Sequence, residues 1–166
     1  MATSGQETDV VRQMRHQPVE LDPIDRKILG ALAKDASRSY AELGKLVNLS
    51  TAAVHDRVKR LRRDGVIKRT VAILDGCKLG RTLLTFLVVD TNSYKATREL
   101  LTFAGRPEVE ELHTVAGDGC VLVKVRAQDT EALENFLMEI QSLDGVRSVR
   151  SYIALSTFLE RGPSPA

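Results

Sequence analysis

Five basic residues lie close together after residue 56 and could bind phosphate. They are Arg57, Lys59, Arg60, Arg62 and Arg63, and they are interleaved with apolar positions at helical spacing. Guanidinium and ammonium groups on a helix face contact phosphate oxygens, which supply much of the affinity and the salt dependence of nucleic-acid binding. A helix that merely faces solvent has the same pattern, so the run alone leaves both interpretations open.

Small polar residues precede this run and could contact bases. Ser50, Thr51 and Ala52 are short enough to enter a major groove, where hydroxyl and methyl groups touch base edges. The pattern therefore predicts double-stranded DNA as the partner. The predicted DNA-contacting residues are Ser39, Ser50, Thr51, Ala52, His55, Arg57, Lys59, Arg60, Arg62 and Arg63.

The positive charge of the chain is concentrated in one segment. Residues 21–70 contain twelve basic and six acidic residues, whereas residues 71–166 contain ten basic and thirteen acidic residues. The whole chain has a net charge of only +2. A basic segment followed by an acidic one indicates a polyanion-binding module joined to a domain with another role.

Three helices are predicted to position the basic residues. The first spans residues 22–34 and begins at the N-cap Asp22. Ser39 and Glu42 have the spacing of a capping box at the start of a short second helix, and Ser50 caps a third helix that ends near residue 65. Because only three or four residues separate the last two helices, the segment is predicted to be a helix-turn-helix domain, winged-helix-like in its fold.

Short strands alternate with helices beyond residue 82. Strands are predicted at 83–90, 108–116, 120–127 and 146–158, and helices at 94–104 and 130–143. The order βαββαβ predicts a ferredoxin-like αβ-sandwich, in which two helices cover one face of a four-stranded antiparallel sheet. The fold class of the chain is therefore α+β.

These patterns divide the chain into five predicted parts. A flexible tail at 1–20 precedes the helix-turn-helix domain at 21–70, and a connector at 71–82 leads to the βαββαβ domain at 83–158. A second tail covers residues 159–166. The βαββαβ domain is predicted to bind an effector and to mediate oligomerisation.

The second face of the predicted sheet remains apolar. If Val121, Val123 and Val125 face the helices, Cys120 and Leu122 face away from them. Contact with a second copy is the simplest way to bury such a face, so the sequence predicts a homodimer formed through the sheet.

Other chemistries have little support in the sequence. Cys77 and Cys120 lack CxxC spacing and are predicted to be free thiols, and the three histidines lack partners at metal-ligand spacing. We therefore predict no metal, no catalytic residue and no cofactor. Because no segment is apolar enough for a membrane helix or a signal peptide, we expect a cytoplasmic protein without a membrane partner.

The motifs in their order resemble the Lrp/AsnC family, the feast/famine regulators, over about residues 21–158. LDPIDRKIL (21–29), AELGKLVNLS (41–50), DRVKRL (56–61) and DGVIKRT (64–70) look like the N-terminal signature of that family, and VAGDGCVLVKV (115–125) resembles its Gly-Asp turn. The resemblance implies a transcription regulator that responds to an amino acid or a related small metabolite. It also implies dimers that form through the sheet and gather into octamers.

The resemblance places the effector site around the Gly-Asp turn. Many family members have a second acidic residue where this chain has Cys120. A carboxylate pairs with the ammonium group of an amino acid, whereas a neutral thiol does not, although the N–H groups of the turn can still bind a carboxylate. The predicted effector-binding residues are His113, Val115, Gly117, Asp118, Gly119, Cys120, Tyr152, Ile153 and Ala154.

Two alternative functions remain open. The first is an architectural DNA-binding protein without an effector, which the thiol of Cys120 favours. The second is an enzyme, because some haem-precursor decarboxylases resemble this family in both domains; His113 and Arg126 would then be the candidate catalytic groups. The basic third helix argues against the enzyme, since such an enzyme has no evident need for it.

Overall fold

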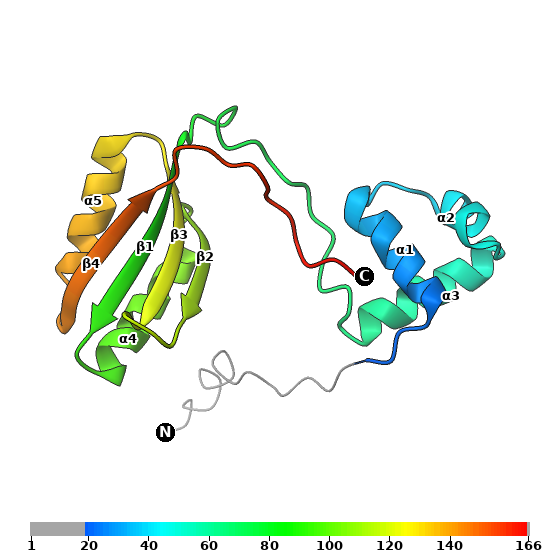
Figure 1. The fold of residues 1–166 in the computed structure, drawn as a ribbon, viewed down its shortest axis with the longest axis horizontal. Coiled ribbons are helices and arrows are strands. Elements are labelled where there is room, and N and C mark those ends of the chain that lie inside the picture. Colours follow the sequence, from blue (N-terminus) through cyan, green and yellow to red (C-terminus); the bar gives the residue numbers. More distant parts are fainter. Residues whose placement is uncertain (1–18, 166) are drawn as a thin grey trace, which may run out of the picture. The chain divides into compact units, whose positions relative to one another are not determined.

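Residues 19–165 are described in the computed structural model of the chain (Figure 1). The predicted tail at 1–20 lies almost wholly outside the described residues. The described residues up to Val71 form one compact unit with those from Arg161 onward, and Ala72–Glu160 form the other unit. Each unit has its own hydrophobic core.

The first unit contains the three predicted helices. They are α1 (Pro23–Lys34), α2 (Tyr40–Val47) and α3 (Thr51–Arg63). Side chains of Asp22, Ser39 and Ser50 accept hydrogen bonds from backbone N–H groups in the first turns, so the predicted N-caps are confirmed. The three helices enclose a core that includes Ile28, Leu43, Val47, Val54 and Val58.

The turn between α2 and α3 is tight because two residues have special backbone properties. Asn48 ends α2 in the left-handed conformation, with φ of 56°. A Cβ atom on Gly44 would lie only 2.6 Å from the carbonyl oxygen of Leu49, so this close approach requires glycine. The turn places the N-terminus of α3 directly after α2, which is the helix-turn-helix arrangement.

The first unit lacks a wing. Residues 64–82, which follow α3 and continue into the second unit, contain no strand. Val71, Ile73 and Leu74 are exposed instead. A strand needs a partner strand for its N–H and C=O groups, and no strand of the described chain pairs with these residues.

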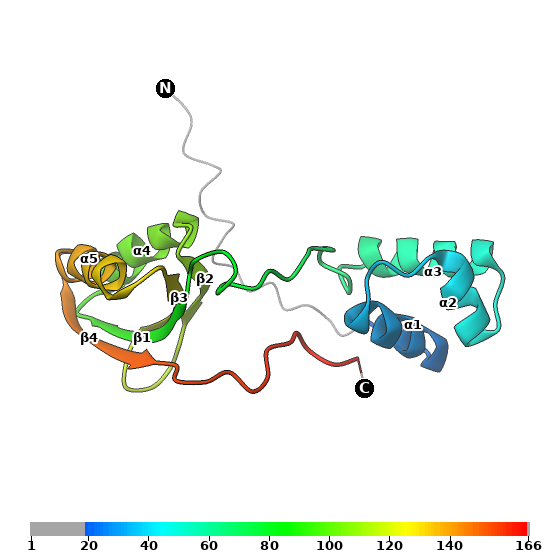
Figure 2. The same cartoon turned by 90° about the horizontal axis from the view of Figure 1, so that it is seen from above.

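The second unit is a four-stranded antiparallel sheet of order β2-β3-β1-β4. Helices α4 and α5 cover one face of this sheet (Figures 1 and 2). The sheet and helices pack around residues such as Leu87, Val123, Phe136 and Ile140. The elements are β1 (Leu83–Thr91), α4 (Tyr94–Leu100), η1 (Leu101–Gly105), β2 (Val109–Thr114), β3 (Val121–Ala127), α5 (Thr130–Gln141) and β4 (Val146–Ile153).

Three elements differ most from their predicted lengths. The helix predicted at 94–104 is α-helical only to Leu100 and continues as a 3-10 helix to Gly105. The strand predicted at 108–116 is shorter at both ends. The strand predicted to reach residue 158 ends at Ile153, because Ala154 makes the last backbone hydrogen bond to β1, at Leu84, close to the start of that strand.

Candidate nucleic-acid interface and effector region

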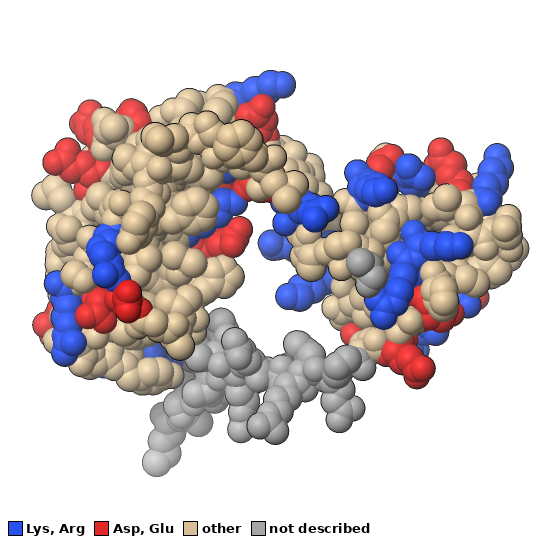
Figure 3. Space-filling model, in the orientation of Figure 1, with Lys and Arg blue, Asp and Glu red and all other residues tan. Residues whose placement is uncertain are grey.

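Helix α3 presents a small tip and an exposed basic flank. Thr51 and Ala52 are exposed in its first turn. Lys59 and Arg62 are exposed farther along, and no ion-pair partner of either lies in the described part of the chain. Figure 3 shows Lys and Arg side chains distributed over this helical unit. The exposed tip and flank can therefore contact a groove and its phosphates.

Ser39 and Ser50 have local structural roles. The hydroxyl oxygen of Ser39 accepts from the N–H of Glu42, and that of Ser50 accepts from the N–H of Ala53, both at 3.2 Å. The Ser39 hydroxyl also donates to the Glu42 carboxylate at 2.8 Å. These bonds satisfy helix N-termini, so contact with DNA would be an additional role.

Arg57 and Arg60, two of the predicted DNA-contacting residues, form ion pairs with aspartates at the start of α1. Arg57 donates to Asp22 at 2.6 Å and to Asp25 at 2.8 Å, and Arg60 also donates to Asp25. The Asp25 side chain is only 1% exposed. A buried carboxylate needs paired donors, and α3 supplies both of these. The two arginines therefore join α3 to α1.

Each charged group in this contact favours the charged form of its partner. The N–H of Asp25 and the guanidinium of Arg57 lower the pKa of the Asp22 carboxyl. In turn, hydrogen bonds to Asp22 and Asp25 raise the pKa of the Arg57 guanidinium. Asp25 also closes a capping box with Asp22 at the start of α1. Asp25 thus completes the capping box of α1 and pairs with the arginines of α3.

The remaining predicted DNA-contacting residues lie on the exposed side of α3 and have nearby partners. The Nδ1 atom of His55 lies 3.3 Å from the carboxylate of Asp56, and its ring packs edge-on against Tyr40. Arg63 donates to Asp64 at 2.9 Å and is 74% exposed. Both side chains are accessible to a ligand.

The Gly-Asp turn lies between β2 and β3 and packs closely on β1. A Cβ atom on Gly119 would lie 2.5 Å from Cγ1 of Val88, so the turn can approach β1 only with glycine there. Cys120 donates its N–H to the carbonyl of Val89 at 2.9 Å. The side chains of Asp118 and Val115 are exposed. The Nε2 atom of His113 lies 3.2 Å from Oε2 of Glu111.

Two charged residues near this turn were missed by the sequence reasoning. The Cys120 thiol donates to the carboxylate of Asp90 at 3.4 Å, and Arg150 donates to the carbonyl of Asp118. Asp90 is at the end of β1, opposite Ser148 of β4. The strand pairing could have suggested Asp90, because β1 and β3 are antiparallel and the end of one meets the start of the other.

Tyr152, Ile153 and Ala154 do not lie near the turn within one chain. Tyr152 pairs with Phe86, whereas Val89 pairs with Val121 beside the turn. The two positions on β1 are three residues apart, or roughly 10 Å. The predicted effector set is thus divided within one chain, because β4 begins beside the turn and runs antiparallel to β1 away from it.

The open face of the sheet is only partly apolar, which limits the prediction of a markedly apolar face. Lys124 and Arg126 also point to this face, since they pair with Phe86 and Leu84 of β1. Lys124 lies 3.2 Å from Glu110 and also pairs with Glu160, and Arg126 pairs with the same two glutamates. The ion pairs form a charged half beside an apolar half.

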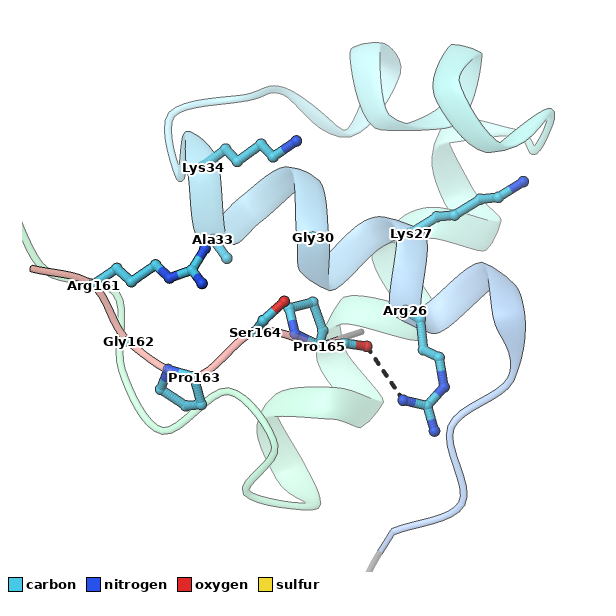
Figure 4. Close-up of a pocket in the computed structure, with 10 residues that line it drawn as sticks. All are labelled: Arg26, Lys27, Gly30, Ala33, Lys34, Arg161, Gly162, Pro163, Ser164 and Pro165. Carbon is cyan, nitrogen blue, oxygen red and sulfur yellow. Dashed lines mark hydrogen bonds between the residues drawn. The ribbon is translucent and has the colours of Figure 1, made fainter. Parts of the chain in front are cut away.

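A pocket of about 520 Å³ lies in the first unit between α1 and residues 161–165 (Figure 4). Arg26 donates to the carbonyl of Pro165 at 3.2 Å. Lys27 and Lys34 extend from α1 away from residues 161–165. The cationic groups do not converge on one point, as an anion site would require.

Residues 19–165 contain no group of three His, Cys, Asp or Glu side chains placed to hold a metal ion. Cys77 and Cys120 are free thiols. None of the helices described is long and apolar enough to span a bilayer.

Comparisons with known proteins cover both units. Residues 21–62 match the AsnC-type helix-turn-helix domain, and residues 85–164 match the Lrp/AsnC ligand binding domain. The chain is 35% identical to the HTH-type transcriptional regulator FL11 of Pyrococcus horikoshii, over 89% of this chain and 97% of that protein. It is also 35% identical to the leucine-responsive regulatory protein of Salmonella typhimurium, over 82% of this chain and 85% of that protein.

The solved structures include a close match in fold. The structure of E. coli AsnC has a TM-score of 0.81 to this chain at 28% identity, and the match covers 89% of this chain and 100% of that one. The helix-turn-helix domain followed by an α+β domain is therefore confirmed.

Proposed function

Because the chain belongs to the Lrp/AsnC family of transcriptional regulators, we propose that it binds specific DNA sequences and responds to an amino acid or a related small metabolite. The observation that carries this proposal is α3, which follows a tight turn and exposes a small tip and a basic flank. This combination is suited to reading a major groove.

In the proposed complex, the two parts of α3 have different roles. Thr51 and Ala52 contact base edges, and they therefore determine sequence preference. Lys59, Arg62 and Arg63 contact phosphates, and they therefore determine affinity and salt dependence. Arg57 and Arg60 hold α3 at its angle to α1 through Asp25.

The effector is proposed to bind at the Gly-Asp turn. The chain is similar to a protein named for its response to leucine, and its C-terminal unit matches a ligand-binding family. The exposed turn offers backbone N–H groups for a carboxylate. Tyr152, Ile153 and Ala154 would join this site from another copy, since they lie farther along the sheet, away from the turn, in their own chain.

We also propose that the second unit forms homodimers through its open sheet face, and that dimers gather into octamers. A two-fold contact of this kind buries the apolar half of each face. It would present two helix-turn-helix units to two half-sites of an operator.

The proposal is tested by two measurements on the purified full chain. Thermal melting against the twenty amino acids should reveal a stabilising ligand, because a ligand at about 100 times its Kd adds roughly 2.7 kcal/mol. Binding to random genomic fragments should enrich a defined sequence. Enrichment of DNA without a stabilising ligand would support the effector-independent architectural role, and failure to bind DNA would contradict the proposal.

An enzyme resembling haem-precursor decarboxylases has weaker support. Arg126, one of its two candidate catalytic groups, is in ion pairs with Glu110 and Glu160. The two relatives described above are named as a transcriptional regulator and as a regulatory protein. A tetrapyrrole that changes its absorbance on mixing with the protein would favour the enzyme.

A further inference from the structure

The segment after β4 leaves large apolar side chains in solvent. Leu155, Phe158 and Leu159 are 95%, 97% and 70% exposed. Apolar side chains gathered in this way favour burial, because their transfer out of water is strongly favourable. We call residues 154–160 the arm.

The arm is attached to the sheet at both ends. At its start, the N–H of Ala154 donates to the carbonyl of Leu84 at 2.9 Å. At its end, the carboxylate of Glu160 pairs with Lys124 and, at 3.6 Å, with Arg126. Both cations point to the open face, so the arm lies on the side of the sheet opposite α4 and α5 (Figure 2).

The open face beside the arm offers apolar surface. Phe86, Val88 and Leu122 are half-buried there, and Tyr152 is 56% exposed. Figure 3 shows this face, and uncharged side chains cover much of it. Apolar side chains in the arm thus lie next to an apolar surface that α4 and α5 do not cover.

The charged half of the face is already neutralised within one copy. Lys124 and Arg126 are only 11% and 15% exposed, and both pair with Glu110 and Glu160. Burial of a charge is costly when the charge has no partner. Both cations would keep a carboxylate partner if a second copy covered them. Glu160 therefore attaches the end of the arm to the sheet and neutralises the two cations of the open face.

We propose that the arm completes the homodimer: Leu155, Phe158 and Leu159 of each copy pack on the open sheet face of the second copy. This inference rests on the homodimer proposed above. An apolar arm and an apolar face on the same unit make a self-complementary, two-fold contact. A stable contact buries about 800 Å² per partner, of which one phenylalanine can supply roughly 150–250 Å².

Sedimentation velocity of the full chain over a dilution series tests the arm. The double variant Phe158→Ser, Leu159→Ser should raise the Kd of the dimer by at least about 100-fold, because two large apolar side chains of each copy no longer leave water. Met138→Ser is the matched control, since Met138 is 61% exposed on α5 at the other face of the sheet. It should leave the monomer–dimer Kd unchanged.

A second variant tests the anchor without removing apolar surface. Glu160→Gln should weaken the dimer on the order of 10-fold at low salt and less at high salt, since it removes ion pairs. If the wild type dimerises and both arm variants match it in Kd, the arm has no role and the dimer proposal stands. A wild type that stays monomeric throughout would overturn both.

Discussion

Arg57 of α3 donates a hydrogen bond to the carboxylate of Asp25 on α1 at 2.8 Å, and that carboxylate is buried. The contact connects residues 32 positions apart and sets the angle of the proposed recognition helix. Two arginines that the sequence pattern predicted to contact DNA therefore also join α3 to α1.

Arg57→Ala should destabilise the first unit by about 2 kcal/mol, because it removes one of two arginine partners from a buried carboxylate. Arg60 would still pair with Asp25, which keeps the loss moderate. Urea denaturation monitored by circular dichroism measures the change. Arg62→Ala is the control and should stay within about 0.5 kcal/mol of the wild type, since Arg62 is exposed. Equal stabilities of the two variants would contradict the structural role of Arg57.

Lys59→Ala and Arg62→Ala should each weaken binding to every DNA sequence and reduce the salt slope by about 1, as expected for a lost phosphate contact. Thr51→Ala should instead change the preferred sequence with little effect on the slope. Fluorescence anisotropy at several salt concentrations separates these effects. A sequence-dependent loss in the lysine and arginine variants would show that they contact bases.

Gly119→Ala should destabilise the second unit by about 1–3 kcal/mol, because the added Cβ would press on the stiff side chain of Val88. Gly105→Ala is a matched control, since nothing lies within 4 Å of the position of its Cβ. Thermal melting of both variants compares them. Similar melting temperatures would mean that the turn can move away from β1 at little cost.

Glu110→Gln should reduce stability at neutral pH and lose this effect in acid. Burial raises the pKa of Glu110, but hydrogen bonds from Arg126 and Lys124 outweigh it and hold the pKa below its ordinary value of 4.5. A lowered pKa in the folded state gives stability that is present above the ordinary pKa and lost as the pH falls through the folded-state pKa.

Chemical denaturation at a series of pH values checks this sign. The difference in unfolding free energy between the wild type and Glu110→Gln should shrink below about pH 4.5. A difference that persists in acid would point to altered packing rather than to the charge of Glu110.

The order of helices and strands, the domain types and the family of this protein could be predicted from the sequence alone. These features depend on local signals, such as the caps Asp22, Ser39 and Ser50, the alternation of Val121, Val123 and Val125, and the ordered motifs. Local hydrogen bonds and the period of apolar residues act over a few positions, so one chain is enough to read them.

Only the tertiary structure decided which side chains meet. Helical spacing placed Arg57 outside the apolar stripe, but it could not reveal that Asp25 lies opposite on another helix. Likewise, the strand pairing separated Tyr152 from the Gly-Asp turn and brought Asp90 to Cys120. A contact between residues distant in sequence depends on the packing of whole helices and strands, so a local sequence pattern does not predict it.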